Sequence, residues 1–473
     1  MTDEEFEMAE GGDVEVAGEK LPESVLVWRD TFVEISKKNS VPSILAYFNL
    51  LGTILKDDIV IPSGMNAEDT RIHVCWIQTA RSGKSVLNDF YSQICEKTFE
   101  YINSTYDKEF NVFDIVDFTD AGLIGSNQEI TNPNVNWREE GEQRKITVPV
   151  KGALEGSGIA LFDEFESSGV FTNKSHRESV VTIFQKFMNT LTTNGYIYKK
   201  KLAGVDVIEC DCQRSTWATT YVPEYLTETI STKGILQRMF FYIREVPQEI
   251  LNEMRYAIID EIGTTIERDK PSLKFAKGMF LLLGLVKDRR EQVGGNKELV
   301  IEWGPGVREN IRSEYDNMQT YMAKVPENVR KIVGLFETNS LIYLTKLSVL
   351  CTISETPARA DNEKWIVFPR NVRQAAWIVR QGYISLVSWM LQALKVERVS
   401  IAEDAGIGNY IEAYNYLKQI TSDDWVLKAA LRVKLEKDYE LSQPKFYRDW
   451  NKVRSIFETK KIGKNVYLKL KEA

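Results

Sequence analysis

Apolar residues recur with two different periods along the chain, and the changes of period divide it into regions. They recur at helical spacing over 21–60 and again over 248–400, whereas short apolar runs that end in polar turns fill 61–247. The pattern predicts an α/β core over 61–247, between a helical N-terminal segment and an all-helical region. In the latter it predicts helices over 248–268, 273–292, 305–323, 327–353 and 370–396.

The two ends of the chain differ in charge. Residues 1–20 contain eight acidic residues and one basic residue, and we expect this acidic tail to be disordered. Residues 441–473 contain nine basic and three acidic residues. Within 401–473 we expect two helices followed by a hairpin that turns at Gly463-Lys464, which is the order of elements in a winged helix.

Composition narrows the protein class. The chain has 473 residues and 43% hydrophobic residues, which predicts a globular protein of several domains. No apolar run is long enough to span a bilayer, and the acidic N-terminus does not resemble a secretory signal. Five scattered cysteines and two histidines favour neither a disulfide framework nor a zinc site. We therefore expect a cytoplasmic protein.

One stretch combines a buried strand, a polar loop and a helix start. The apolar run Val74–Ile77 leads into a loop that closes on Gly83-Lys84-Ser85. This is the pattern of a P-loop, or Walker A motif, in which backbone N–H groups and a lysine bind phosphate and a hydroxyl binds Mg²⁺. The predicted ATP-binding residues are Gln78, Thr79, Ala80, Arg81, Ser82, Gly83, Lys84, Ser85 and Val86.

The motif departs from the usual pattern at its first position. Where G-x-x-x-x-G-K-[ST] has its first glycine, this chain has Gln78. Phosphate binding is still expected, because the glycine nearest the phosphates is Gly83.

A second apolar run ends in two carboxylates. Residues 159–162 are apolar and are followed by Asp163-Glu164, as in a Walker B motif. We expect Asp163, with Ser85, to bind Mg²⁺ and Glu164 to polarise the attacking water. The alternative is an ordinary strand that ends in solvated acids.

Other residues are candidates for assisting hydrolysis. Thr219 and Thr220 end a predicted short strand, 215–220, where a hydroxyl could sense the γ-phosphate. Arg238, at the start of the next strand, is a candidate arginine finger for a neighbouring subunit. Candidates for an arginine of the helical region that contacts nucleotide are Arg330, Arg370 and Arg373.

Two basic surfaces are candidates for DNA contact. Lys199, Lys200 and Lys201 lie on a predicted hairpin that precedes the strand of Thr219, and a solvated basic turn is the alternative. The C-terminal candidates, which a protein-interaction module would explain equally well, are Lys445, Arg448, Lys452, Lys460, Lys461 and Lys464.

Together these motifs resemble the ring-forming P-loop ATPases (AAA+-like) of phage, viral and mobile-element replication. The group includes superfamily 3 viral helicases, minichromosome-maintenance-like helicases and a phage family whose ATPase domain is often fused to a primase. The resemblance rests on residues 82–85, 161–164, 199–201 and 234–238. It implies a homo-oligomeric ring, a hexamer in most such proteins, that hydrolyses ATP to move along DNA.

Three functional hypotheses remain open at this point. The first is a replicative helicase or translocase, for which priming must come from another protein because no primase segment is present. The second is a loader of clamps or helicases, or a DNA-packaging motor. The third is a nucleotide-gated DNA-binding protein, such as an origin-recognition factor or a transposition regulator, that does not unwind DNA.

Overall fold

A computed structural model of the chain forms two compact units, residues Met1–Met390 and Leu391–Ala473. It describes residues 15–16, 19–36, 39–63, 66–115, 119–131, 145–165, 178–189, 197–201, 207–221, 238–260, 262–263, 267–355, 365–404, 407–421, 424–439, 446–447, 450, 453–463 and 465–471. Most of the predicted acidic tail lies outside these residues. Its described part is a pair of two-residue strands, β1 (Glu15–Val16) and β2 (Glu19–Lys20).

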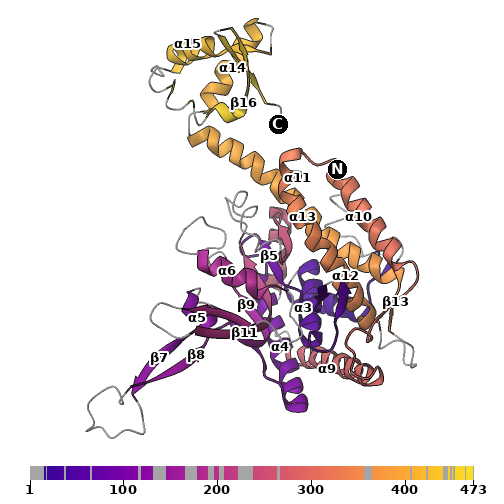
Figure 1. Ribbon diagram of the computed structural model, residues 1–473. Coiled ribbons are helices and arrows are strands. Elements are labelled where there is room, and N and C mark those ends of the chain that lie inside the picture. Colours follow the sequence, from indigo (N-terminus) through magenta and orange to yellow (C-terminus); the bar gives the residue numbers. More distant parts are fainter. Residues whose placement is uncertain are drawn as a thin grey trace. The chain divides into compact units, whose positions relative to one another are not determined.

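The N-terminal unit is built on a parallel sheet of five strands flanked by helices (Figure 1). The strand order is β12-β5-β11-β9-β6, and a sixth strand, β10, pairs antiparallel with β11. Every residue of β5 is buried, and Trp76 of β5 and Trp217 of β11 pack as large core side chains. The strands are β5 (Val74–Gln78), β6 (Phe110–Asp114), β9 (Gly156–Phe162), β10 (Ile197–Lys201), β11 (Val207–Thr220) and β12 (Phe240–Arg244). The α/β core is therefore confirmed.

β11 differs from its prediction. The second arm of the predicted lysine hairpin and the predicted short strand 215–220 form one continuous strand of 14 residues. Lys199 pairs with Glu209, eleven positions before Thr220. At about 3.3 Å per residue, the backbone of Lys199 therefore lies roughly 36 Å along β11 from Thr220.

The N-terminal helices of this unit were predicted well. α2 (Glu23–Ser36) and α3 (Ser40–Leu55) both lie within the predicted helical segment 21–60, and α3 packs against β9, β11 and β5. α3 is buried at nearly every position, which explains its continuous apolar sequence. The remaining helices of the core are α4 (Lys84–Tyr106), α5 (Asp120–Ile124) and α6 (Glu178–Phe187).

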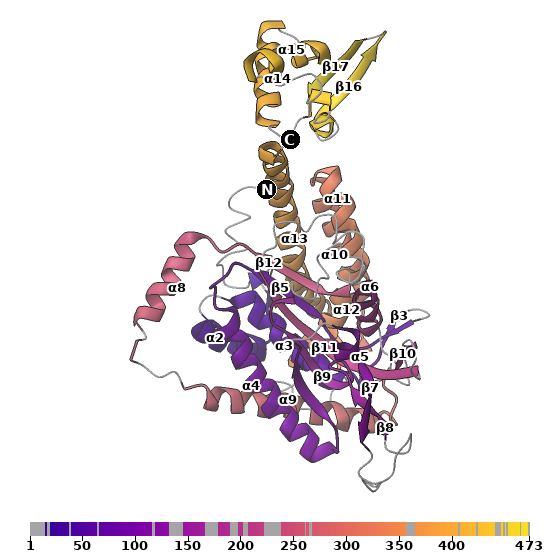
Figure 2. The ribbon, with the colours of Figure 1, turned by 90° about the vertical axis from the view of Figure 1, so that its left-hand side faces the viewer.

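The helical region after β12 has one break that was not predicted. The expected helix over 327–353 is divided into α11 (Glu327–Val333), the 3₁₀ turn η5 (Gly334–Phe336) and α12 (Glu337–Ser354). The other helices are α8 (Gln248–Asp260), α9 (Asp269–Gln292), α10 (Val307–Ala323) and α13 (Pro369–Asp404), of which α8 stands away from the rest of the unit (Figure 2). Within the described ranges, no helix combines the length and apolar content needed to cross a bilayer.

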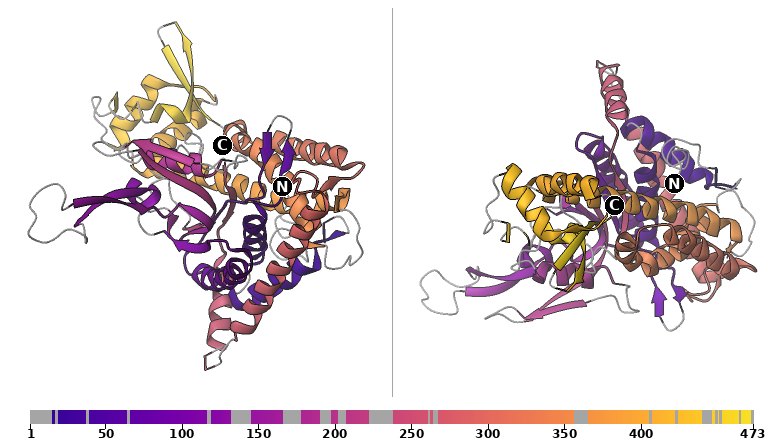
Figure 3. Two further views of the ribbon diagram at one scale, coloured as in Figure 1. Left: turned by 60° about the horizontal axis from the view of Figure 1, so that its bottom comes forward. Right: turned by 90° about the horizontal axis from the view of Figure 1, so that it is seen from above.

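Besides β1–β2, three two-stranded pairs complete the described part of the N-terminal unit; two are antiparallel, and the third, β13 with β14, is parallel. The longest, β7–β8, projects from the core (Figure 3). The pairs are β3 (Ile61–Ser63) with β4 (Asn66–Glu68), β7 (Gly125–Thr131) with β8 (Lys145–Lys151), and β13 (Glu302–Trp303) with β14 (Ile366–Val367).

The C-terminal unit has its own core. A three-stranded antiparallel sheet, β15-β17-β16, packs with helices around Leu431, Leu435 and Leu468. Aromatic rings stack in the series Tyr410, Phe446, Trp450 and Phe457. Its elements are α14 (Ile407–Thr421), β15 (Val426–Leu427), α15 (Lys428–Tyr439), η7 (Arg454–Ile456), β16 (Phe457–Ile462) and β17 (Asn465–Leu470).

Candidate functional site

The predicted phosphate loop connects β5 to α4 at the carboxyl edge of the sheet. Gly83 caps α4 with φ of +81°, and Arg81 also takes a left-handed conformation, with φ of +60°. A side chain at Gly83 would bring its Cβ to 2.4 Å from the carbonyl oxygen of Ser36, at the end of α2. Glycine is therefore required at this position both by the backbone angle and by the close approach of α2.

Gln78 has a structural explanation. Its side chain accepts a hydrogen bond from Trp76 Nε1 (2.8 Å) and donates to Asn39 Oδ1 (2.8 Å) and to the Ser82 carbonyl (3.2 Å). Asn39 Nδ2 donates to the same Ser82 carbonyl at 2.9 Å. Gln78 ends β5 and is not among the residues with positive φ, so no glycine is needed there. It fastens the loop to the α2–α3 junction.

Lys84 is held inside the loop. Its Nζ donates to the carbonyl oxygens of Gln78 (2.6 Å) and Thr79 (2.9 Å) and lies 4.5 Å from the ring centre of Tyr221. Burial lowers the pKa of Lys84 to about 8, although the Asp163 carboxylate opposes that shift. A partly desolvated ammonium group bound only to carbonyls and a ring is well placed to exchange these contacts for an anion.

The carboxyl ends of β9 and β11 meet beside this loop. Thr219 Oγ1 donates to Asp163 Oδ1 at 2.9 Å, and Asn88 Nδ2 of α4 donates to Thr219 Oγ1 at 3.0 Å. Asn88 is fixed in turn by Trp217 Nε1, at 2.9 Å. This chain of hydrogen bonds joins the three elements that carry the predicted motifs.

Of the two threonines, Thr219 is the one that contacts Asp163. Successive side chains of a strand point to opposite faces, so Thr220, which is buried, lies on the other face of β11. Of the two candidate threonines, Thr219 is therefore the one whose hydrogen bond to the Asp163 carboxylate is defined.

Glu164 is exposed and takes a left-handed conformation, with φ of +57°. This conformation is uncommon for a residue with a side chain and is characteristic of functional sites. Beside it, burial and the carboxylates of Asp163 and Asp89 raise the pKa of Asp114, at the end of β6. Asp89 and Asp114 were not predicted as site residues, although Asp114 directly follows an apolar run.

The donor groups fit Mg²⁺. Ser85 is exposed in the first turn of α4 and Asp163 is exposed at the end of β9, and a hydroxyl and a carboxylate are hard oxygen ligands. Among the described residues no group of three or more His, Cys, Asp or Glu could hold a metal ion alone.

Arg238 lies at the other edge of the sheet. It precedes β12, whose first residue pairs with the first residue of β5, so the length of a strand separates it from Lys84. Its Nε donates to Asn189 Oδ1 at 2.9 Å, and burial lowers its pKa. Arg238 therefore cannot reach the phosphate loop of its own chain.

The other predicted arginines and lysines belong to three different parts of the chain. Arg370 pairs with Glu355 at 2.8 Å, Arg373 lies 3.5 Å from Asn310 Oδ1, and Arg330 is exposed on α11. The backbone of Lys199, Lys200 and Lys201 forms β10, but their side chains are outside the described part. Lys460 and Lys461 are exposed on β16, while Lys445, Arg448, Lys452 and Lys464 lie outside the described residues.

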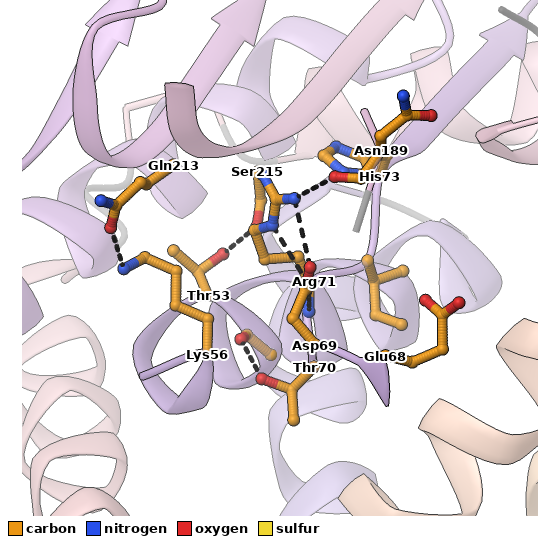
Figure 4. Close-up of polar contacts among 12 residues, drawn as sticks. Thr53, Lys56, Glu68, Asp69, Thr70, Arg71, His73, Asn189, Gln213 and Ser215 are labelled. Atoms are coloured by element: carbon orange, nitrogen blue, oxygen red, sulfur yellow. Dashed lines mark hydrogen bonds and ion pairs between the residues drawn. The ribbon is translucent and has the colours of Figure 1, made fainter. Parts of the chain in front are cut away.

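A buried polar cluster occupies the amino edge of the sheet (Figure 4). Arg71 pairs with Asp69 (3.2 Å) and donates to the carbonyl oxygens of Arg214 (3.0 Å) and Asn189 (2.7 Å). The backbone N–H of Thr216 donates to His73 Nδ1, and burial lowers the pKa of His73 well below its usual range. His73 is therefore neutral, and its contacts are those of a structural residue.

No family model matches the sequence, and no curated protein matches it either.

Proposed function

We propose that the chain is an ATPase that forms a ring and acts on DNA, as a replicative helicase or translocase. One observation carries the ATPase part: three adjacent parallel strands, β5, β11 and β9, end together at the Lys84 loop, Thr219 and Asp163. A cation, a hydroxyl and a carboxylate at one sheet edge, beside a helix N-terminus, are the groups that phosphoryl transfer from ATP requires.

Each residue has a role in this proposal. Lys84 exchanges its two carbonyl partners for the outer phosphates of ATP, and backbone N–H groups of residues 79–85 bind them from below. Ser85 and Asp163 would hold Mg²⁺, which neutralises charge on the transferred phosphoryl group. Glu164 accepts a proton from the attacking water, and Thr219 fixes the Asp163 carboxylate through its 2.9 Å hydrogen bond.

The ring and DNA parts rest on the amino edge of the sheet. Arg238 and the lysine strand β10 both lie away from the chain's own phosphate loop. An arginine that cannot serve its own site can serve the site of a neighbouring copy, as an arginine finger does. Lysines on a strand far from the nucleotide are free to meet the phosphates of DNA in the channel of a ring.

We also propose that the C-terminal unit is a winged helix and that the core is AAA+-like. The element order of the C-terminal unit, α14-β15-α15 followed by the β16–β17 hairpin, supports the first proposal. The exposed Lys460 and Lys461 would then lie on the wing, near a bound duplex.

The experiment measures ATP turnover with and without single-stranded DNA, over a range of salt, together with unwinding of a forked duplex. We expect DNA to stimulate turnover and the fork to open. Lys84→Ala should lose both activities through an ATP affinity lower by about 100-fold, which corresponds to roughly 2.7 kcal/mol. Turnover without stimulation or unwinding would contradict the motor and leave the nucleotide-gated DNA-binding protein.

A triple variant separates the DNA contact from catalysis. Replacing Lys199, Lys200 and Lys201 by Ala should remove the stimulation and keep the basal turnover. The matched control removes the same charge from exposed positions elsewhere, Lys186, Lys324 and Lys331, and should keep both activities. Equal loss of stimulation in the two variants would mean that β10 has no specific role.

A further inference from the structure

α8 presents large apolar side chains to solvent. Tyr256 is 68% exposed and Ile259 is 56% exposed, whereas Leu251 and Met254, on the opposite side of the helix, are buried in a small cluster with Val246. Figure 2 shows α8 standing away from the sheet and from α9. Burying apolar surface is favourable by about 25 cal/mol per Å², so covering this side of α8 with a binding partner would lower the free energy.

The exposed side of α8 is also acidic. Glu249 and Glu253 lie two turns and one turn before Tyr256, respectively, and Asp260 lies one turn after it. At helical spacing these four residues form one stripe, which is apolar in its middle and negatively charged along its length.

A complementary stripe lies on α9. Lys274, Gly278, Leu281 and Leu285 follow one another at intervals of four, three and four residues, and all four are exposed. Leu281 is 65% exposed. Lys277, also exposed, lies next to this stripe, so the stripe is apolar with positive charge at one end.

A cavity of about 800 Å³ opens beside the α9 stripe. Lys274 and Gly278 belong to its lining, and Trp28, Phe275 and Met279 contribute apolar surface. Interfaces of high affinity are often anchored by an aromatic side chain in such a recess.

Gly278 gives independent support for a close approach. A glycine inside a helix costs about 0.5–1 kcal/mol relative to alanine, and a Cβ built at Gly278 would meet nothing within 4 Å. The described part of its own chain therefore gives no reason for glycine at this position. A second helix that packs across Gly278 would explain the glycine, because a side chain there would keep the two helices apart.

We propose that α8 of one copy of the chain docks on the α9 stripe of a second copy, with Tyr256 at the mouth of the cavity. The acids of α8 face Lys274 and Lys277, and Leu281 and Leu285 cover Ile259. Because the two surfaces differ, the contact is head-to-tail and propagates into a ring or a filament. Its place in a ring motor rests on the proposed function, but the contact itself does not require ATP hydrolysis.

The base of α8 touches the phosphate loop. The backbone N–H of Val246 donates to Thr79 Oγ1 at 2.9 Å, and the Thr79 N–H donates to the Arg244 carbonyl at 3.3 Å. Only one residue, Pro247, separates Val246 from the start of α8, so docking of α8 on a neighbour would act close to the nucleotide site of its own chain.

Cross-linking between two single-cysteine variants tests the proposal. Chains carrying Ile259→Cys are mixed with chains of a different tag length carrying Leu281→Cys, and a bis-maleimide of about 10 Å reach is added. All five native cysteines are buried, so the wild-type chain is the background control. We expect a heterodimer band, formed with or without ATP.

The result that overturns the proposal is also defined. Residues 261–268 could allow α8 to fold onto α9 of its own chain. In a second experiment one chain carries both Ile259→Cys and Leu281→Cys. A cross-link that forms only within this double variant, or no cross-link in either experiment, excludes the docking. Because the readout is a gel band, a failed proposal for ATPase function would leave this test unaffected.

Assembly measured by analytical ultracentrifugation gives a second test. Tyr256→Asp should raise the protein concentration needed for half-assembly at least about 10-fold, and Gly278→Phe should do the same from the other surface. Tyr416→Asp, at a tyrosine that is 48% exposed in the C-terminal unit, is the matched control. An equal effect of all three variants, or no effect of the first two, contradicts the docking.

Discussion

The two edges of the central sheet use charge in opposite ways. At the amino edge, Arg71 is buried with Asp69 and two backbone carbonyls, and Lys346 Nζ lies 3.5 Å from Glu68. At the carboxyl edge, Lys84 donates its hydrogen bonds to two backbone carbonyls in the described part of the chain, and Asp163 and Glu164 are exposed. The charged side chains of the amino edge form ion pairs with one another, whereas those of the carboxyl edge are available to bind a ligand.

The two edges also differ in backbone conformation. The carboxyl edge contains Arg81 and Glu164, two of the three non-glycine residues with positive φ in the described part of the chain. Strain of this kind costs of order 1–3 kcal/mol for each residue and persists where the surroundings enforce it. The comparison teaches that the amino edge stabilises the sheet on which a strained and charged edge can be maintained.

The largest effect is expected from Arg71→Ala at the amino edge. It leaves the Asp69 carboxylate buried without its guanidinium partner, so the free energy of unfolding should fall by about 3–5 kcal/mol. Urea denaturation measures the change. Lys331→Ala, which removes an exposed ion pair with Glu327, is the control and should cost less than about 1 kcal/mol. Equal stability of the two variants would remove the contrast between the edges.

Glu164→Gln tests the other edge. Turnover should fall by about 10²- to 10⁴-fold because the general base is lost, while ATP affinity and the urea midpoint stay close to wild type. Single-turnover hydrolysis and calorimetric titration measure the two quantities. Glu109→Gln, at an exposed glutamate outside the site, should behave as wild type. Unchanged turnover in Glu164→Gln would assign the base to another residue.

Gln78→Gly tests whether Gln78 stabilises the fold, like the charges of the amino edge, or limits ATP binding at the carboxyl edge. Restoring the usual glycine leaves Trp76 Nε1 and Asn39 Oδ1 without their partners and should lower the free energy of unfolding by about 1–3 kcal/mol. Denaturation and ATP titration are measured together. A variant that keeps its stability and binds ATP more tightly would instead show that Gln78 restrains the loop.

The smallest expected effect is the uptake of a fraction of one proton when ATP binds. The pKa of Lys84 is about 8 and the usual lysine value is 10.5, so free protein loses this charge as the pH rises through 8. ATP phosphates favour the charged form and raise the pKa, so binding at pH 8.5 should take up a fraction of one proton, and binding below pH 7 none. Calorimetry in two buffers of different ionisation enthalpy measures the uptake. Uptake that persists in Lys84→Arg would come from another group.

The local motifs were predictable from the sequence because neighbouring residues supply them. Lys84 and Asp163 follow apolar runs, and a buried strand followed by a loop fixes where each side chain lies. The continuous β11 was missed because the polar residues Asp211, Gln213 and Arg214 interrupt its apolar pattern. Its continuity comes from two neighbouring strands, since β10 pairs with it as far as Asp211 and β9 pairs with it from Cys212 onward.

Residues that act through distant contacts were not predictable. Asn39 and Asn88 lie 43 and 131 positions from the loop and threonine groups that they bind, and an isolated asparagine gives no periodic signal. The choice of Thr219 over Thr220 depends on which face of β11 meets α4, which the sequence pattern did not determine.

The contact between Ser36 and Gly83 has a consequence for how this chain could be divided. The predicted phosphate loop lies within residues 78–85, yet its shape depends on Ser36 and Asn39, which precede the sheet in the chain. A fragment that starts at the first strand of the sheet would retain the motif but lose Ser36 and Asn39, whose contacts hold the loop in its conformation. Recombination that exchanged the sheet between proteins would have to carry the α2–α3 junction with it.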